Sequence, residues 1–292
     1  MGDTLSRPIT DKQSERYEND RFRVGVSGMQ GWRRGMEDAH CAVLDLEGAP
    51  PGSSFYGVFD GHCGQNIAKY CGDNLCRRVI EDPHFKEEKF VEAMIGGFLG
   101  TDEDILNDPQ LRHDGSGCTA VTALITATHI YCGNAGDSRC VLSRDGKAIP
   151  LSTDHKPTNE TELKRIQKAG SFVSSGRVNG NLALSRAIGD FEFKQNKNLP
   201  PAEQAISAKP DVVVHQITPQ DEFVVLACDG VWDVMSNEDV VTFVKRRLQK
   251  TNDLASICEN IFDECLAPSA PGLGCDNMTM IIVQFKNPEK KA

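Results

Sequence analysis

The fold of this sequence is constrained most by its short runs of β-branched and aromatic residues, which follow one another in blocks. Runs of this length between turn residues predict β-strands. Helical segments separate the blocks, but strands and helices do not alternate strictly as in a doubly wound parallel sheet, so antiparallel sheets are favoured. The predicted strands are Phe22–Ser27, His40–Leu46, Ser54–Phe59, Thr119–Ile125, His129–Cys132, Arg139–Ser143, Val212–Ile217, Glu222–Cys228 and Met278–Phe285.

Helical periodicity marks a smaller number of segments. Apolar residues recur every four positions across residues 67–79 and 240–248, and a third stripe runs over Leu254–Cys265. Ser236-x-x-Asp239 has the form of a capping box, which predicts a helix start. Two packed sheets with helices on their outer faces agree with this order of strands and helices along the chain. The predicted fold class is α+β, a central sandwich of two antiparallel β-sheets flanked by helices (αββα).

The two ends of the sequence lack these patterns. Residues 1–21 are polar and without periodicity, so we expect a flexible N-terminal segment, and residues 287–292 form a short polar tail. No linker divides the chain between them, which predicts one domain over residues 22–286. The stretch Phe191–Lys209 mixes charges with a proline pair, as an excursion from a compact body would.

Charge and cysteine content narrow the partners and the compartment. The formal net charge of -10 disfavours nucleic acid, whose affinity for proteins comes largely from Lys and Arg. The eleven cysteines form no CxxC pair, which is typical of reduced thiols in a cytosolic protein. No apolar run is long enough to span a membrane and the N-terminus is polar, so we expect a cytoplasmic protein, with the nucleus left open. Gly2 and Ser6 formally fit the N-myristoylation pattern, although Asp3 is unusual there.

Three Asp-Gly pairs follow apolar runs, where a tight hairpin turn is the ordinary interpretation. Asp145-Gly146 fits it, because strand-like residues lie on both sides. Asp60-Gly61 and Asp229-Gly230 instead lead from an apolar strand into a helix. Each of these two places a carboxylate at the end of a buried strand, and the glycine allows the backbone to approach a ligand closely.

Two further acidic sites lie against apolar runs. Glu37-Asp38 follows a glycine-rich stretch, and Asp276 precedes the last predicted strand. A carboxylate beside the core is costly unless it is paired or binds a metal. Oxygen ligands without a His or Cys set suit Mg²⁺ or Mn²⁺ better than Zn²⁺. Each acid taken singly could equally be a surface residue, so spacing alone leaves both interpretations open.

A series of short motifs follows in order over roughly residues 22–285. The motifs are Gly31-Trp-Arg33, Met36-Glu-Asp-Ala-His40, Val58-Phe-Asp-Gly-His62, Gly117-Cys-Thr-Ala120, Asn134-Ala-Gly-Asp-Ser-Arg139, Asp154-His-Lys-Pro157, Leu184-Ser-Arg-Ala-Ile-Gly-Asp190, Ala227-Cys-Asp-Gly-Val-Trp-Asp233 and Asp276-Asn-Met278. Each motif alone is weak evidence, but the ordered series is specific, and it resembles the metal-dependent phosphatases known as protein phosphatase 2C.

This resemblance implies hydrolysis of phosphoserine and phosphothreonine on proteins at a centre of two Mg²⁺ or Mn²⁺ ions. Such a pair lowers the pKa of a shared water and clamps the attacking and leaving oxygens. Asp60 is implied to bridge the ions, Asp229 and Asp276 to complete one site, and the other ligands to serve the second, partly through water. The implied ligands are Glu37, Asp38, Asp60, the Gly61 carbonyl, Asp229 and Asp276.

Two basic residues are implied to act on the substrate. Arg33 would hold the phosphate, because its planar fork matches phosphate oxygens, and His62 would donate a proton to the leaving oxygen. Without the motifs, a surface ion pair and a packed imidazole are the ordinary interpretations. Asp137 and Asp233 resemble positions that bind a third, weaker metal in some members of the family.

The resemblance further implies a flap over about residues 157–211, beside the catalytic groove. Phosphorylated proteins are the expected partners, and we expect a monomer. Cys63 stands where a smaller residue is usual, which suggests sensitivity to oxidation. Asp154, His155 and Arg186 are expected to order the strands beside the site rather than to react.

Other functions compete with this one. Cys71 and Arg77 have the spacing of cysteine-dependent phosphatases, but Cys71 lies on a helical apolar stripe, and Asp73 would repel a phosphate. Inactivation by a chelator or by a thiol alkylator would separate the two chemistries. An inactive phosphatase fold that serves as a binding module should have lost metal ligands, which this sequence retains. A two-metal nuclease lacks a basic groove.

Overall fold

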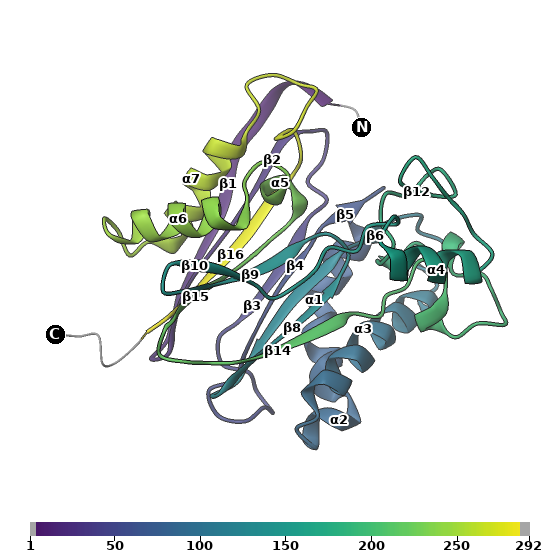
Figure 1. The fold of residues 1–292 in the computed structure, drawn as a ribbon, viewed down its shortest axis with the longest axis horizontal. Coiled ribbons are helices and arrows are strands. Elements are labelled where there is room, and N and C mark those ends of the chain that lie inside the picture. Colours follow the sequence, from purple (N-terminus) through teal and green to yellow (C-terminus); the bar gives the residue numbers. More distant parts are fainter. Residues whose placement is uncertain (1–3, 287–292) are drawn as a thin grey trace.

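The computed structural model describes residues 4–286, so Gly2 and the tail 287–292 lie outside the described residues. Two antiparallel sheets pack face to face, and helices cover both outer faces (Figure 1). The predicted αββα sandwich of class α+β is confirmed. No helix among the described residues is long and apolar enough to cross a membrane.

The first sheet has six strands in the order β1-β2-β16-β15-β9-β10. Its central strands are buried on both faces, which explains their almost continuous apolar sequence. The hairpin predicted at Asp145-Gly146 is confirmed, because these two residues, both with positive φ, connect β9 to β10. The strands are β1 Thr4–Glu18, β2 Phe22–Arg33, β16 Met278–Phe285, β15 Asp221–Ala227, β9 Arg139–Arg144 and β10 Lys147–Pro150.

The second sheet has five strands in the order β14-β8-β7-β4-β3. Val224 and Leu226 of β15 point toward it and share a core with Tyr56 and Val58 of β4. Alternate residues of β15 face the helices on the other side. The strands are β14 Asp211–Gln216, β8 His129–Ala135, β7 Ala120–Ile125, β4 Ser54–Phe59 and β3 Ala39–Val43.

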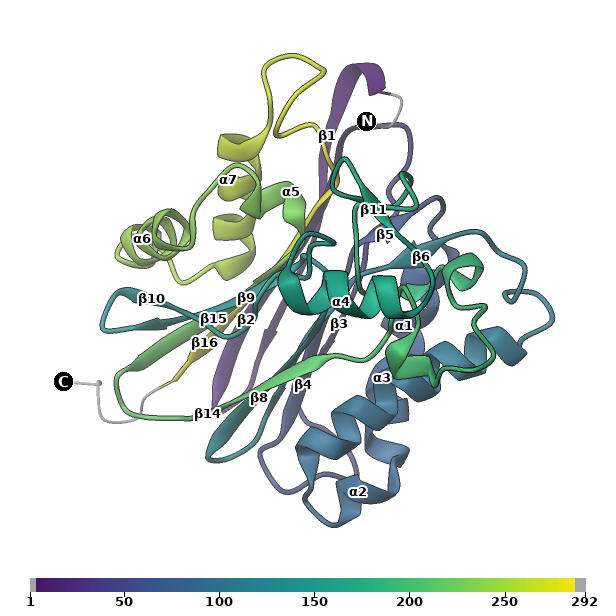
Figure 2. The ribbon, with the colours of Figure 1, turned by 45° about the vertical axis from the view of Figure 1, so that its right-hand side comes forward.

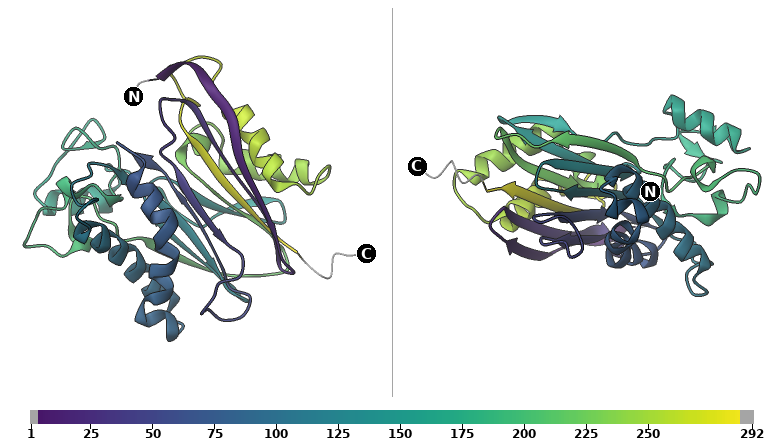
Figure 3. Two further views of the ribbon diagram at one scale, coloured as in Figure 1. Left: turned by 180° about the vertical axis from the view of Figure 1, so that it is seen from behind. Right: turned by 90° about the horizontal axis from the view of Figure 1, so that it is seen from below.

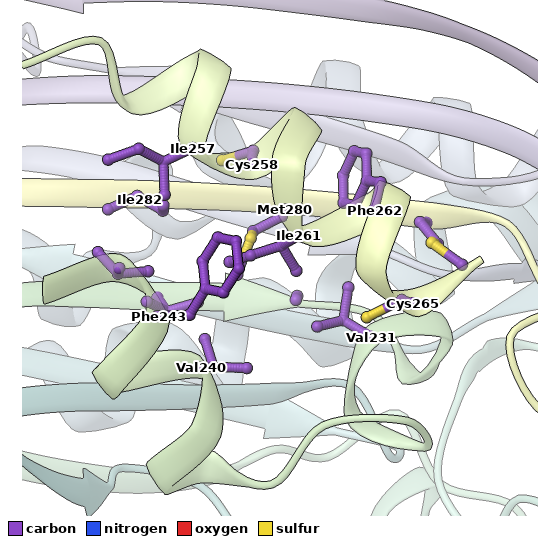
Figure 4. Close-up of a cluster of buried hydrophobic side chains, with 14 of the residues drawn as sticks. Val231, Val240, Phe243, Ile257, Cys258, Ile261, Phe262, Cys265, Met280 and Ile282 are labelled. Carbon is purple, nitrogen blue, oxygen red and sulfur yellow. The ribbon is translucent and has the colours of Figure 1, made fainter. Parts of the chain in front are cut away.

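Helices cover the outer face of each sheet, as the view from below shows (Figure 3). Phe243, Ile261 and Phe262 pack against Met280 and Ile282 of β16 (Figure 4). The capping box predicted at the start of α6 is present. The helices on the first sheet are α5 Asp229–Trp232, α6 Asn237–Leu248 and α7 Leu254–Cys265, and those on the second are α1 Asn66–Glu81, α2 Pro83–Lys86 and α3 Phe90–Asn107.

The expectation of a flexible segment over residues 1–21 is wrong for Thr4–Glu18, which form the edge strand β1. This strand pairs with β2 and runs beside α7 (Figure 3). The contacts of its side chains with α7 are polar: Lys12 Nζ lies 2.6 Å from Asp263 Oδ1, and Ser14 Oγ donates to Glu259 Oε1 at 2.7 Å. A strand held by backbone bonds and polar contacts leaves no apolar alternation in the sequence.

Short elements gather at one end of the sandwich (Figure 2). The stretch 157–211 holds α4 Glu160–Lys168, two short 3₁₀ helices, Phe191–Phe193 and Pro201–Glu203, and a hairpin of β11 Val173–Ser174 and β12 Arg177–Val178. A separate three-stranded sheet has the order β13-β6-β5. Its strands are β5 Gly61–His62, β6 Gly117–Cys118 and β13 Ile188–Gly189.

Candidate active site

Four acidic segments meet at one end of the sandwich. Asp60 directly follows β4, and Asp229 lies two residues beyond β15. Glu37 and Asp38 lie between β2 and β3, and Asp276 lies two residues before β16. Because these strands belong to different sheets, both sheets contribute carboxylates to the same place.

Most of the predicted site residues border one cleft of about 710 Å³. Asp38 and Asp233 do not border it directly, and Asp233 lies in a neighbouring hollow with Arg33 and Asp276. Part of the stretch 157–211 also reaches the cleft, through Arg177 and residues 181–184. The predicted residues at the cleft are Arg33, Glu37, Asp60, Gly61, His62, Asp137, Asp229 and Asp276.

The carboxylate of Asp60 belongs to two compact groups of ligand atoms. One group joins Asp60 with Asp137 and Asp229, and the other joins it with Asp38 and Cys228; within each group the atoms lie within 4.8 Å of one another. Cys228 was not predicted as part of the site, because it continues the apolar run of β15. Its position directly before Asp229 was the signal that could have included it.

Burial and mutual repulsion make this cluster unfavourable in its charged form. Burial, and then the nearby carboxylates of Asp276 and Glu37, raise the pKa of Asp38 to about 7. Burial and neighbouring carboxylates likewise raise the pKa values of Asp60 and Asp229 well above their usual range. Cations bound between the carboxylates would relieve both effects.

One orphaned oxygen tests whether the cluster fits a metal. Oδ2 of Asp38 accepts a hydrogen bond from Thr279 Oγ1 at 2.7 Å, whereas its buried Oδ1 has no hydrogen-bond partner among the described residues. A buried carboxylate oxygen without a donor is costly. Oxygen-rich donors of this kind fit Mg²⁺ or Mn²⁺.

Backbone packing brings Gly61 close to the acidic loop. A Cβ at Gly61 would lie 2.1 Å from the carbonyl oxygen of Glu37, so only glycine fits there. Asn277 holds the same loop: its Oδ1 accepts from the Glu37 N–H at 2.9 Å, and its Nδ2 donates to the carbonyl of Gly35 at 3.0 Å. The sequence placed Asn277 in a motif but gave it no role.

Arg33 lies at the edge of the cleft and pairs with a carboxylate of the cluster. Its guanidinium donates to Oδ2 of Asp276, and its side chain is 36% exposed. A guanidinium that is partly exposed at an acidic site can exchange one oxyanion partner for another. The position therefore suits an incoming phosphate group.

His62 reaches the cleft from β5 and contacts a residue that the sequence did not single out. Its Nε2 lies 2.8 Å from Oδ2 of Asp190, whose side chain is 5% exposed. Burial alone would lower the pKa of His62, but the hydrogen bond and charge of Asp190 outweigh it, so the pKa is raised. The imidazole therefore keeps a proton more readily than an ordinary histidine.

Asp137 and Asp233, the two residues suggested for a third metal, have different neighbours. Asp137 lies beside Asp60 and Asp229 and accepts a hydrogen bond from Lys156 Nζ. Asp233 belongs to neither group of close ligand atoms. In this structure the ammonium group of Lys156 supplies the positive charge next to Asp137.

Two cysteine hypotheses can be compared with the structure. Burial and the charges of Asp190 and Glu37 raise the pKa of the Cys63 thiol, which argues against a reactive thiolate there. Cys71 is fully buried on α1, the helix that also carries Arg77. These two residues do not form the phosphate-binding loop of a cysteine-dependent phosphatase.

Comparisons with known proteins agree with the geometry. The family model described as protein phosphatase 2C matches residues 22–272. "Protein phosphatase 2C homolog 2" of Schizosaccharomyces pombe is 52% identical over 291 residues, which cover 98% of this chain and 79% of that protein. The relative of the same name in Hypocrea jecorina is 51% identical over 302 residues, covering 100% of this chain and 68% of that one. A solved phosphatase of Toxoplasma gondii has a TM-score of 0.81 at 27% identity, covering 94% of this chain and 96% of that chain.

Proposed function

Because this chain belongs to the protein phosphatase 2C family of serine/threonine phosphatases, we propose that it hydrolyses phosphoserine and phosphothreonine on proteins at a centre of two Mg²⁺ or Mn²⁺ ions. The phosphatase activity follows from the family. The two-metal centre is supported by one observation above all: the carboxylate of Asp60 belongs to both compact groups of ligand atoms. A single carboxylate shared in this way can serve two ions.

The proposed ligands share Asp38, Asp60 and Asp229 with these two groups. Asp60 would bridge the two ions, Asp229 and Asp276 would complete one site, and Glu37, Asp38 and the Gly61 carbonyl would serve the other, partly through water. The orphaned Oδ1 of Asp38 supports a cation on that side. Two divalent ions held by these residues would supply a water of lowered pKa and would neutralise developing charge on the phosphate.

The remaining residues bind and protonate the substrate. Arg33 would give up its bond to Asp276 and hold two oxygens of the phosphate group, which fixes the phosphorus in line with the attacking water. His62 would give a proton to the serine or threonine oxygen as the P–O bond breaks. The stretch 157–211 would contact the protein around the phosphorylated residue, since part of it borders the cleft.

A third ion, the oligomeric state and the location complete the proposal. Asp137 and Asp233 would bind the third ion only if Lys156 leaves Asp137, since its ammonium group occupies that carboxylate. We propose a monomeric enzyme of the cytoplasm, in keeping with its net charge and its free cysteines.

Removal of metal tests the proposal directly. We expect hydrolysis of a phosphothreonine peptide to stop in excess chelator and to return when Mn²⁺ or Mg²⁺ is restored, because carboxylate sites hold labile ions. Released phosphate is measured in both states, with a thiol alkylator as a parallel treatment. Full activity in chelator, or loss of activity on alkylation alone, would contradict the metal centre.

A further inference from the structure

Asp190 and His62 are brought together by the small sheet β13-β6-β5. Within it, His62 pairs with Gly117, and Gly117 pairs with Gly189, the residue directly before Asp190. The carboxylate and the imidazole come from positions 128 residues apart and meet beside β6, with Nε2 of His62 2.8 Å from Oδ2 of Asp190. Because the paired strands of this sheet bring the two side chains together, the contact is a built arrangement rather than a chance encounter of surface side chains.

The space for this contact exists because residue 117 has no side chain. A Cβ at Gly117 would lie 2.4 Å from Oδ2 of Asp190 and 2.8 Å from Nε2 of His62. The backbone of Asp190 has a φ of 52°, a left-handed conformation that costs energy for a residue other than glycine. Both features serve to place this carboxylate against the imidazole.

A buried ion pair fixes the strand that carries Asp190. Oδ1 of Asp102, on α3, accepts from the Gly189 N–H at 2.8 Å and from Lys194 Nζ at 2.8 Å. Lys194 Nζ also donates to the carbonyl of Ala187 at 2.9 Å. The segment on both sides of Asp190 is therefore held from α3, so its carboxylate has little freedom to leave His62.

From this geometry we infer that Asp190 is a positioning residue for His62: it keeps a hydrogen on Nε2 and thereby makes Nδ1 the atom that protonates the leaving group. A carboxylate only accepts, so Nε2 must be the donor of the pair. The ring has one other nitrogen, and that nitrogen is the one left for the substrate. The inference rests on the proposed role of His62 as the acid and assigns the atom and its partner.

The proton transfer balances on these two residues. Water adds to phosphorus while the bond from phosphorus to the serine or threonine oxygen breaks. That oxygen takes the proton from Nδ1, and the imidazolium becomes a neutral imidazole that keeps its hydrogen on Nε2, bonded to Asp190. The products are the free hydroxyl and dihydrogen phosphate, which keeps both hydrogens of the attacking water until it loses one to solvent, and solvent restores the proton to Nδ1.

Asp190→Asn tests the assignment through the leaving group. An amide can either accept from Nε2 or donate to it, so it no longer decides which nitrogen carries the hydrogen. We expect kcat on a phosphoserine peptide to fall roughly ten- to hundred-fold. On p-nitrophenyl phosphate, whose leaving group barely needs a proton, kcat should fall less than about threefold, and KM should stay within about twofold on both substrates.

A second variant and a matched control exclude a merely structural effect. Gly117→Ala inserts a methyl group between the pair and should show the same selective loss, so it carries the test if Asp190→Asn fails to fold by circular dichroism. Asp221→Asn removes the charge from another buried aspartate beside a histidine, 3.1 Å from His215 Nε2 and at the far end of β15. Its ratio of the two kcat values should equal that of the unchanged protein.

His62→Gln separates the inference from the proposed function. If His62→Gln lowers kcat selectively on the phosphoserine peptide but Asp190→Asn and Gly117→Ala do not, the positioning role of Asp190 is wrong. The role of His62 as the acid would still hold. If His62→Gln lowers kcat equally on both substrates, His62 is not the acid and both assignments fall. If the inference is correct, adding Asp190→Asn to His62→Gln causes no further selective loss.

Discussion

At the scale of single residues, Asp60 and Asp145 are both aspartates that precede a glycine, but their surroundings are opposite. Asp145 turns the exposed hairpin between β9 and β10 in a left-handed conformation with φ of 50°. Asp60 lies at the end of buried β4 among other carboxylates. The contrast shows that the pair Asp-Gly carries no function by itself; burial and the neighbouring carboxylates distinguish Asp60 from Asp145.

We predict that Asp60→Asn nearly abolishes turnover while the fold survives. Asparagine removes the charge of the one carboxylate shared by both ligand groups, which weakens the binding of two ions together, and a loosely held pair cannot fix the line of attack. Hydrolysis of a phosphothreonine peptide measures the effect. A remaining rate above about a tenth, which is a loss below about 1.4 kcal/mol in the barrier, would remove the bridging role.

Asp145→Asn is the control for this experiment. Asparagine adopts the left-handed turn conformation as readily as aspartate, so both activity and stability should stay near those of the unchanged protein. Circular dichroism of both variants checks that the comparison concerns chemistry and not folding.

At the scale of elements, α4 is tied to the body of the protein by a buried acid between two arginines. Glu162 is 1% exposed, accepts from Arg165 Nη1 at 2.6 Å and from Arg186 Nη2 at 2.7 Å, and Arg186 also bonds Asp211 at the start of β14. Burial alone would raise the pKa of Glu162, but the hydrogen bonds and charges of the two arginines lower it to about 2. The expectation that Arg186 orders neighbouring strands agrees with these contacts.

The sign of the pH dependence follows from this lowered pKa. Glu162 stabilises the folded chain fully above its ordinary value of 4.5, and the contribution disappears as the pH falls toward about 2. We predict that Glu162→Gln lowers the free energy of unfolding by about 3–5 kcal/mol at pH 7, the usual cost of breaking a buried pair. At pH 3 the difference should be clearly smaller, as urea denaturation at the two pH values will show.

Glu160→Gln on the same helix is the matched control. Glu160 is 82% exposed and pairs with Lys164 one turn away, an arrangement worth at most about 0.5 kcal/mol. An equal loss of stability at pH 7 and pH 3 in Glu162→Gln would contradict the ionic origin of the effect.

The strand β1 shows why some elements escape prediction. Its side chains alternate between solvent and polar groups of α7, so neither face supplies the apolar period that marks a strand. Central strands such as β15 are covered on both faces, and their apolar runs made them recognisable. The sequence pattern therefore predicts strands whose burial requires apolar side chains. It does not predict a strand that is held mainly by backbone hydrogen bonds to its neighbour.

At the scale of the whole molecule, the sandwich could be predicted, whereas the partners of the site residues could not. The proposed ligands were recognisable because each of these acids lies close to an apolar run in the sequence. Asp190 was not, because its contact with His62 exists only after β5, β6 and β13 have come together. The contact of Lys156 with Asp137 was not predicted for the same reason, because it forms only in the folded chain.

The core behind the site should dominate the stability of the molecule. Phe262 is fully buried between α7 and the first sheet, and Phe262→Ala should lower the free energy of unfolding by about 3–5 kcal/mol. Phe172 is 58% exposed, and Phe172→Ala should change the free energy of unfolding by less than about 0.5 kcal/mol. Chemical denaturation of both variants measures the difference, and similar losses would contradict the assigned core.

The carboxylates that both sheets place at the cleft also affect how long the protein would survive in a cell. Carboxylates crowded at one end of the sandwich push the two sheets apart, and a cation held between them turns that repulsion into attraction. Proteases cut chains that have opened, in proportion to the open population, and a ligand of the folded chain alone reduces that population. The supply of divalent ions would then set the turnover of the protein itself as well as that of its substrates.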